Sequence, residues 1–373
     1  MPWEHYAAVP GDDGGSLLVV GERLPCVLSD DHVPLPRELD ALAPLVGRPR
    51  FLRLGAHVDL GDRCLRLVEL DASAGDEQLA VADADPEALA PPELVPALTR
   101  WLDEQRGAPV PPARPAWSRP GWHAHAEAWA GQPLRQERVW PLSAVLAGEG
   151  VYLKAVFGGF RHEPAVTQAL AREHPGSVPE VLRIEEHEGL LLTAALHGKP
   201  GWECDSAAAA FETLERIQHA WRGRLDELAA LGAPDRTLPV LERAVEGLVA
   251  DAAPELADAV PELERACREL ASRGEPPTIC HGDFHPGNVV VDDGGGAVIF
   301  DWSDTCIAYA SFDRHLFLFD RDDPGGDDPL AALGACLHQG VSYRDIVARF
   351  APDDRWWFAD EPRRWLDRAV ALL

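Results

Sequence analysis

The stretch CHGDFHPGNVVVDDGGGAVIFDW, residues Cys280 to Trp302, decides the fold that this sequence predicts. It holds two short apolar runs, VVV and AVIF, which are separated by the glycine-rich turn DDGGG. A turn of this kind between β-branched runs predicts a β-hairpin. The run TIC just before it is β-prone and predicts a further strand, which ends where the loop beginning at His281 turns away.

Three polar side chains flank this predicted hairpin. Because a hairpin brings its two ends together, we expect Asn288, at the start of the first strand, beside Asp301, at the end of the second. An amide oxygen and a carboxylate are hard ligands that suit Mg²⁺, which usually keeps waters and substrate phosphates as well. Asp283, on the preceding loop, can accept a proton from an attacking hydroxyl. The pattern therefore predicts phosphoryl transfer, with Asn288 and Asp301 as metal ligands and Asp283 as the base.

The motif HGDFHPGN followed by VIFDW resembles the aminoglycoside phosphotransferase and choline kinase group of small-molecule kinases, which are relatives of the protein kinases. The protein-kinase signature H-R-D-x-x-x-x-N has the same separation between its base and its asparagine, and the DFG motif supplies the other metal ligand. In this sequence glycine replaces the arginine, and Asp-Trp stands where DFG would. The resemblance implies ATP and Mg²⁺ as cofactors and His281 as a catalytic-loop brace. The alternative is that these acids and the asparagine only shape two turns.

The segment upstream of the motif supports the same interpretation. ERVWPLSAVLAGEGVYLKAVF predicts three strands, EPAVTQALAREH a helix, and VPEVLRIEEHEGLLLTAAL two more strands. A kinase needs a lysine on the third strand for the α- and β-phosphates and a helix glutamate to pair with it. Lys154, one of only two lysines in the chain, lies on the predicted third strand, and Glu163 opens the helix. The alternatives are a surface lysine on an edge strand and a glutamate that complements the helix dipole.

The remaining nucleotide contacts have no distinctive motif. No GxGxxG lies between the first two of these strands. The resembled group uses a short loop with a hydroxyl residue there, which makes Leu142 and Ser143 the candidates for covering the phosphates. A plain β-turn serine is an equal alternative for Ser143. In the segment that joins the lobes, Thr193, Ala195 and Leu196 are expected to hydrogen-bond the adenine through backbone atoms.

The chain after Asp205 is predicted to be mostly helical. SAAAAFETLERIQHAWRGRLDELAALG carries a helical stripe that stops at Gly232, and two more helices follow before the motif. Beyond the motif, Asp304 is either a substrate contact or a loop cap. In the resembled group an aspartate at the distance of Asp313 anchors the loop to a following helix, and we expect that role here.

Composition limits the class of protein. The 373 residues are 46% hydrophobic and 26% charged. The net charge of −28 argues against nucleic acid as a partner, because a phosphate-binding surface needs a basic face and none is visible in the sequence. The seven scattered cysteines form no CxxC pair, so neither a zinc site nor a disulfide framework is expected. The acidic start and the lack of a long apolar run predict a cytoplasmic protein without a signal peptide or a membrane span.

The predicted fold class is α+β. We expect a bilobal protein-kinase-like fold, with a small antiparallel β lobe and a helical lobe, preceded by a small α+β accessory domain. The predicted domains are the accessory domain at residues 1–106, a proline-rich linker at 107–121, the kinase N-lobe at 122–196 and the helical C-lobe at 197–373.

The predicted function is ATP- and Mg²⁺-dependent transfer of the γ-phosphoryl group to a hydroxyl of a small molecule. The acceptor is left open between an aminoglycoside-like antibiotic, which would mean antibiotic resistance, a sugar or amino sugar, and an amino alcohol. The acidity favours a cationic acceptor only weakly, and both a monomer and a homodimer are compatible with the sequence. The rival is a kinase fold that binds without catalysis, against which the presence of Lys154, Asp283, Asn288 and Asp301 argues.

Overall fold

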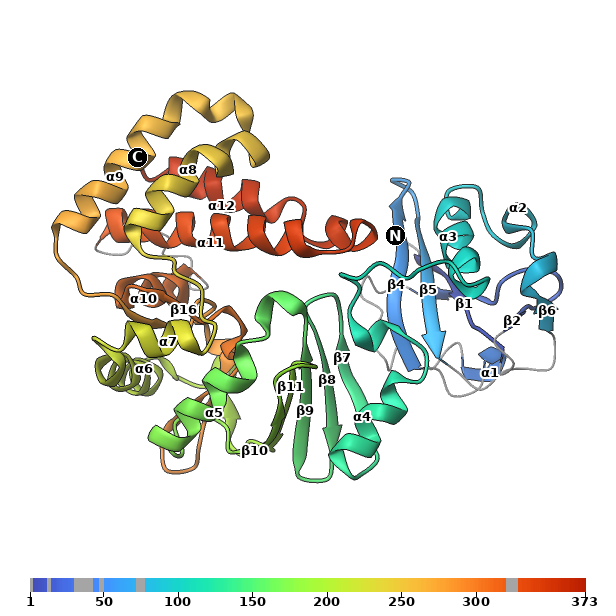
Figure 1. The fold of residues 1–373 in the computed structure, drawn as a ribbon, viewed down its shortest axis with the longest axis horizontal. Helices are drawn as coiled ribbons and strands as arrows, with labels where there is room; N and C mark the ends of the chain where they lie inside the picture. The colour runs from blue at the N-terminus through green and yellow to red at the C-terminus, as the bar shows by residue number, and fades with distance from the viewer. Residues whose placement is uncertain (1–2, 12–14, 30–42, 47–49, 72–77, 320–327) are drawn as a thin grey trace. The chain divides into compact units, whose positions relative to one another are not determined.

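The structure, a computed structural model, describes residues 3–11, 15–29, 43–46, 50–71, 78–319 and 328–373. The chain forms two compact units (Figure 1). The first unit comprises Met1–Ala155 together with Phe350–Asp354, and the second comprises Val156–Arg349 together with Arg355–Leu373. The predicted domain boundaries at residues 106, 121 and 196 stay predictions.

The first unit begins with a four-stranded sheet of order β3-β1-β5-β4. Its strands are β1 (Trp3–Ala8), β3 (Cys26–Ser29), β4 (Arg50–Asp59) and β5 (Cys64–Asp71). The β1–β5 pair is parallel and the other two pairs are antiparallel. Helix α3 (Val95–Gln105) packs Leu98 and Trp101 into the same apolar core as Leu65 and Leu67 of β5. The expected α+β character of this region is confirmed.

Short elements complete this part of the first unit. They are β2 (Ser16–Leu18), α1 (Ala43–Val46), β6 (Gln78–Ala80), η2 (Val81–Asp83), α2 (Pro86–Leu89) and η3 (Ala116–Ser118). The proline-rich segment 107–121 is packed against its surroundings: Trp117 and Arg114 are buried, and the Trp117 indole N–H donates to the Trp140 carbonyl at 3.1 Å. This segment is therefore an ordered part of the unit.

A five-stranded sheet follows, with the order β10-β11-β9-β8-β7. The strands are β7 (Arg135–Val139), β8 (Ser143–Gly148), β9 (Val151–Val156), β10 (Val181–Glu185) and β11 (Leu190–Ala194), with α4 (Trp122–Ala130) before them, and η4 (Gly158–Phe160) and α5 (Glu163–Glu173) between β9 and β10. The predicted order of three strands, a helix and two strands is confirmed. β9 is the central strand of the five.

Beyond β11, the second unit is largely helical. The helices are α6 (Ala207–Trp221), α7 (Leu225–Ala230), α8 (Leu238–Ala252), α9 (Val260–Ser272), α10 (Ala310–Phe319), α11 (Pro329–Arg349) and α12 (Glu361–Val370). The 3₁₀ turns are η5 (Gly201–Glu203), η6 (Pro254–Ala259) and η9 (Pro352–Trp357). The residues of η9 begin in the first unit and end in the second. In Figure 1, α8, α9, α11 and α12 form one group, and their buried side chains share one apolar core.

One helix prediction is wrong in its extent. The stripe expected to run to Gly232 as one helix is divided into α6 and α7. The break lies at Arg222–Arg224, where Gly223 has a φ of 76°, a left-handed conformation that ends a helix. The apolar periodicity continues across the break because Trp221 and Leu228 both join the same core, so periodicity alone could not reveal it.

The motif stretch forms two small antiparallel sheets. β13 (Thr278–Cys280) pairs with β16 (Cys306–Ala308), and β14 (Val289–Val291) pairs with both β15 (Ala297–Ile299) and β12 (Lys199–Pro200). Two 3₁₀ turns, η7 (Pro286–Asn288) and η8 (Trp302–Asp304), lie immediately before β14 and after β15. The predicted strand, hairpin and turn are confirmed.

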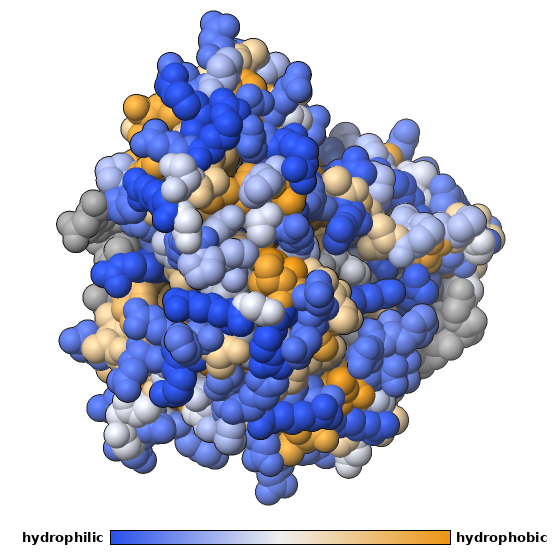
Figure 2. Space-filling view, turned by 60° about the vertical axis from the view of Figure 1, so that its left-hand side comes forward, coloured by the Kyte–Doolittle hydropathy of each residue, from blue (hydrophilic) through white to orange (hydrophobic). Residues whose placement is uncertain are grey.

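The surface seen in Figure 2 is mostly polar and the cysteines form no disulfides, as the composition predicts. Polar side chains prevail on the face shown in Figure 2, where apolar side chains are scattered. All seven cysteines, each of them in a described segment, are unpaired. Among the described helices, none has both the length and the apolar character that a bilayer crossing requires.

Candidate active site

The loop that follows β13 is held against the backbone of η8 at Gly282. Gly282 has a φ of 82°, and a Cβ atom at this position would lie 2.2 Å from the Asp304 carbonyl oxygen. Both the left-handed backbone and the close approach exclude a side chain. This is the physical reason why glycine stands where the protein-kinase signature has arginine.

Asp313, in the first turn of α10, fixes this loop. Its carboxylate accepts hydrogen bonds from the backbone N–H groups of His281 (2.8 Å) and Gly282 (2.9 Å) and from Nε2 of Gln218 (2.8 Å). Burial raises the pKa of Asp313 to about 7, although these three donors act in the opposite direction. The expected anchoring role of Asp313 is confirmed.

The ring of His281 connects the loop to the end of β15. Its Nε2 lies 2.9 Å from the Phe300 carbonyl oxygen, which can only accept, so Nε2 carries the proton. Nδ1 then accepts from the backbone N–H of Asp283 at 3.3 Å. Burial lowers the pKa of this fully buried imidazole, so it is neutral in this arrangement. The geometry is that of a brace between Phe300 and Asp283.

The carboxylate of Asp283 is about half exposed and is oriented by Asn288. Nδ2 of Asn288 donates to the Asp283 carbonyl oxygen at 2.8 Å and to Oδ2 of its side chain at 3.3 Å. The ring of His285 lies nearby, with Nε2 at 3.6 Å from the same Oδ2 and Nδ1 accepting from the Gly287 N–H at 3.0 Å. His285 thus caps η7, in keeping with its position inside the motif.

The hairpin brings Asn288 and Asp301 to the same end. In its register Val289 faces Ile299, and the Phe300 N–H donates to the Asn288 carbonyl at 3.0 Å. Asn288 directly precedes the first strand of the hairpin, and Asp301 directly follows Phe300 at the end of the second. Asp301 has a φ of 64°, a left-handed conformation that is uncommon for residues other than glycine. A backbone conformation of this kind persists only where the surrounding structure holds it, and such residues are common at functional sites.

Ser303 is a site residue that the sequence analysis missed. Its Oγ lies 2.9 Å from Oδ1 of Asp301 and 2.7 Å from Oε2 of Glu163, at the start of α5. Glu163 is 1% exposed, whereas a glutamate that only complements a helix dipole would have no need of burial. No sequence signal marks Ser303, because the contact joins residues 140 positions apart.

The residues at the hairpin end fit a magnesium ion by their chemistry. Since the amide nitrogen of Asn288 is engaged by Asp283, its oxygen is the atom left for a cation, and the Asp301 carboxylate provides a second hard ligand. Within the described ranges, no three His, Cys, Asp or Glu side chains gather as a metal cluster. One carboxylate and one amide suffice where phosphates and waters complete the shell.

Three predicted nucleotide ligands lie in the first unit. Lys154 is half-buried on β9, the central strand of its sheet, which is not the edge position that a surface lysine would require. Leu142 and Ser143 are buried at the start of β8, and the Ser143 hydroxyl accepts from the Trp140 indole N–H at 2.8 Å. The nucleotide-binding roles of all three stay predictions.

The remaining predicted residues lie in the second unit. Thr193 pairs with Val181 near the end of β11, and Ala195 and Leu196 follow it in the segment before β12. Asp304 closes η8, with its carbonyl oxygen against Gly282. Adenine binding at the first three and substrate contact at Asp304 stay predictions.

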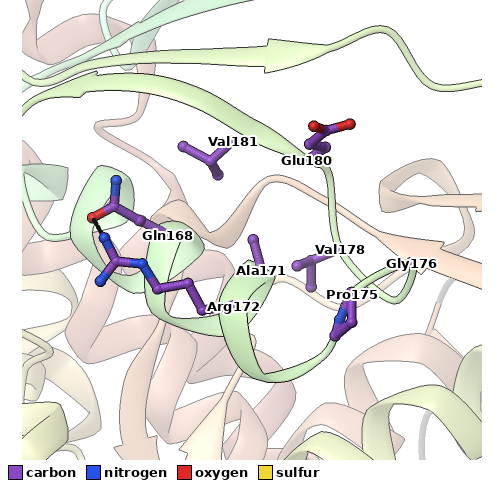
Figure 3. A pocket seen from close by; sticks show the side chains of 8 residues that line it. All are labelled: Gln168, Ala171, Arg172, Pro175, Gly176, Val178, Glu180 and Val181. Atoms are coloured by element: carbon purple, nitrogen blue, oxygen red, sulfur yellow. Dashed lines mark hydrogen bonds between the residues drawn. The ribbon is translucent and has the colours of Figure 1, made fainter.

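A cavity of about 450 Å³ is lined by residues other than the predicted site residues. Figure 3 shows it between the second half of α5 and the start of β10, with Arg172 donating to Gln168 at its rim. None of Asp283, Asn288 and Asp301 lines it. The cavity therefore gives no information on the acceptor of the candidate active site.

Comparisons with known proteins agree with the motif. The model of a phosphotransferase enzyme family (APH) matches residues 154–349, which is more than half of the chain and includes Lys154, the loop of Asp283 and the hairpin. No curated protein matches the chain. The predicted family resemblance is confirmed, and with it the protein-kinase-like fold class.

Several solved structures are similar at low identity. A choline/ethanolamine kinase family protein from Mesorhizobium loti is 19% identical with a TM-score of 0.49, over 67% of this chain and 97% of that one. The choline kinase LicA from Streptococcus pneumoniae is 12% identical with a TM-score of 0.48, over 67% and 98%. The aminoglycoside phosphotransferase APH(3'')-Id from Streptomyces rimosus is 19% identical with a TM-score of 0.40, over 66% and 96%.

Proposed function

Because the chain belongs to the phosphotransferase enzyme family, a family of small-molecule kinases, we propose that it transfers the γ-phosphoryl group of ATP to a hydroxyl of a small molecule. The observation that carries the proposal is the group formed by Asp283, Asn288 and Asp301. A half-exposed carboxylate is oriented by an amide, and that amide lies at the same hairpin end as a second carboxylate. Phosphoryl transfer depends mainly on such positioning and on charge stabilisation.

Asp283 is the proposed base. It accepts the proton of the acceptor hydroxyl as the oxygen attacks the γ-phosphorus atom, and the bond from that phosphorus to the β,γ-bridging oxygen breaks. Its exposure leaves room for the acceptor, and the Asn288 amide holds one of its oxygens. His281 and Asp313 contribute by fixing the loop, since their bonds end on backbone atoms of residues 281 to 283.

Asn288 and Asp301 are the proposed magnesium ligands. When bound, the cation would neutralise the charge that develops on the phosphates during transfer. Lys154, with Glu163, is proposed to hold the α- and β-phosphates, Leu142 and Ser143 to cover the phosphates, and the backbone at Thr193, Ala195 and Leu196 to bind adenine.

The acceptor is proposed to be a hydroxylated antibiotic of the aminoglycoside type, a sugar or amino sugar, or an amino alcohol. The net charge of −28 gives modest support to a cationic acceptor and speaks against nucleic acid or an anionic membrane as a partner. Seven unpaired thiols suit a reducing compartment, which supports a cytoplasmic location.

The substitution Asp283→Asn tests the base assignment. General-base catalysis contributes about 10²–10⁴-fold to a rate, so kcat should fall by that factor for any acceptor that the wild type phosphorylates. Mg²⁺-dependent ATP consumption is measured against a panel of aminoglycosides, sugars, amino sugars and amino alcohols. ATP affinity, measured by calorimetry, should change little. Asp293→Asn, at an exposed acid of the hairpin turn, is the matched control.

The panel also separates catalysis from the alternative, a kinase fold that binds without turnover. ATP binding without consumption for every acceptor would favour the binding protein. Neither binding nor consumption would remove the kinase proposal, and full activity of Asp283→Asn would overturn the base assignment alone.

A further inference from the structure

The hydroxyl of Ser303 lies between two carboxylates that belong to different elements. Its Oγ is 2.7 Å from Oε2 of Glu163, on α5, and 2.9 Å from Oδ1 of Asp301, at the end of the hairpin. Ser303 is 4% exposed and Glu163 is 1% exposed. Both distances are those of O–H···O⁻ hydrogen bonds.

A serine hydroxyl carries one proton, whereas both of its neighbours are acceptors when ionised. At any moment Ser303 therefore donates to one carboxylate and turns a lone pair toward the other. The two hydrogen bonds exclude each other, and the charge on each carboxylate decides which of them forms.

We propose that Ser303 is a positioning residue that shares its proton between Asp301 and Glu163 and so couples cation binding to the position of α5. The inference rests on the proposed function, in which Asp301 is a magnesium ligand. A cation on Asp301 withdraws charge from its carboxylate and weakens its attraction for the Ser303 proton. The Ser303 hydroxyl then donates its hydrogen bond to Glu163, which fixes the start of α5 against η8.

The left-handed backbone at Asp301 makes this coupling specific to the local geometry. With a φ of 64°, Asp301 turns the chain directly from β15 into η8, so that Ser303, two residues later, faces back toward its carboxylate.

The test uses Mn²⁺ as the probe and is independent of turnover. Mn²⁺ affinity is measured by electron paramagnetic resonance in the presence of a non-hydrolysable ATP analogue, and amide hydrogen exchange is followed across α5 with and without Mn²⁺. In the wild type, Mn²⁺ should slow amide exchange at the start of α5, because the Ser303 hydroxyl then donates to Glu163. Ser303→Ala should abolish this protection, since no hydroxyl remains to turn from Asp301 to Glu163.

Two controls separate positioning from general damage. Ser311→Ala removes another serine–glutamate hydrogen bond of 2.7 Å, to Glu275, and should leave both readouts unchanged. Ser303→Thr keeps the hydroxyl and should keep the coupling. Unchanged Mn²⁺-dependent protection of α5 in Ser303→Ala would overturn the proposal.

Glu163→Gln provides a second variant if Ser303→Ala does not fold. The glutamine amide can donate to Ser303 Oγ, which leaves the serine hydrogen for Asp301 whether or not Mn²⁺ is bound, so the Mn²⁺-dependent protection of α5 should be lost. Retained protection contradicts the proposal. A wild type that shows the Mn²⁺ coupling but phosphorylates no acceptor would remove the proposed function and leave the coupling in place, whereas an active wild type without the coupling would remove only this inference.

Discussion

Two buried charged centres, one in each compact unit, are built in opposite ways. In the second unit, Asp313 accepts hydrogen bonds from two backbone N–H groups and one amide, with no cation beside it among these partners. In the first unit, Arg53 donates to the carboxylates of Glu69 at 2.9 Å and Asp354 at 3.2 Å. The carboxylates of Glu69 and Asp354 outweigh burial and raise the pKa of Arg53.

The difference concerns what each centre fixes. Asp313 binds main-chain atoms of adjacent residues and so defines the shape of one loop. Arg53 binds side chains that are far apart in the sequence, and with Arg114, which lies 3.4 Å from Asp353, it fastens the segment Phe350–Asp354 to the first unit. The first centre is suited to positioning chemistry, and the second to holding distant parts of the chain together.

The largest expected effect comes from breaking the Arg53 centre. Arg53→Met leaves Glu69 and Asp354 buried without their common partner, which typically costs about 3–5 kcal/mol. The free energy of unfolding is measured by urea denaturation. Arg63→Met, which removes an exposed pair with Glu4 in the same unit, should cost about 0–1 kcal/mol. Equal losses for both variants would show that burial of the Arg53 pairs has no special weight.

A smaller loss of stability is expected from Asp313→Asn. The amide keeps one acceptor oxygen but turns an NH₂ group toward a backbone N–H, and an unsatisfied buried donor costs about 1–3 kcal/mol. For a unit of this size, thermal unfolding should shift down by about 2–4 °C per kcal/mol. Asp293→Asn, at an exposed acid, serves as the reference. Kinase activity, which depends on the loop, should fall further than stability alone explains, and a fully active variant would refute the anchoring role.

The smallest expected effect is a change in pH dependence near the loop. Burial lowers the pKa of His338, on α11, to about 3 from 6.5, so between these values the unfolded chain binds a proton that the native chain does not. Stability from this group is present above pH 6.5 and is lost on acidification toward pH 3.

Asp313 acts with the opposite sign. With a pKa raised to about 7 from 3.8, it lets the native chain bind the extra proton, so its contribution falls as the pH rises between these values. Only the wild type loses the His338 contribution on acidification. Lowering the pH from 7 to 5.5 should therefore raise the free energy of unfolding of His338→Gln by about 1 kcal/mol relative to that of the wild type. Urea denaturation at both pH values measures this, and parallel curves would contradict it.

The sequence predicted most of what is local. The hairpin, the loop before it and the Asn288–Asp301 juxtaposition follow from two short apolar runs and the turn residues between them, and all appear in the structure. The division of α6 from α7 could not be predicted, because one glycine interrupts a stripe whose core face continues. Ser303 was missed because its contact with Glu163 is set by tertiary packing, and a serine two residues after an acid carries no pattern of its own.

The first unit was the least predictable region. Arg53, Glu69 and Asp354 belong to three separate segments, and nothing in their local sequence distinguishes them from exposed charges. A buried ion-pair centre becomes visible only when the fold places its members together.

The location of Phe350–Asp354 has a consequence for the order in which the protein can mature. The chain is synthesised from its N-terminus, yet two of the carboxylates that neutralise Arg53 come from positions 353 and 354. The first unit therefore cannot complete its own interior until residues 353 and 354 have left the ribosome. For the same reason a fragment that stops at residue 155 would keep the guanidinium and lose two of its counter-charges, so the two units cannot simply be cut apart and studied as independent halves.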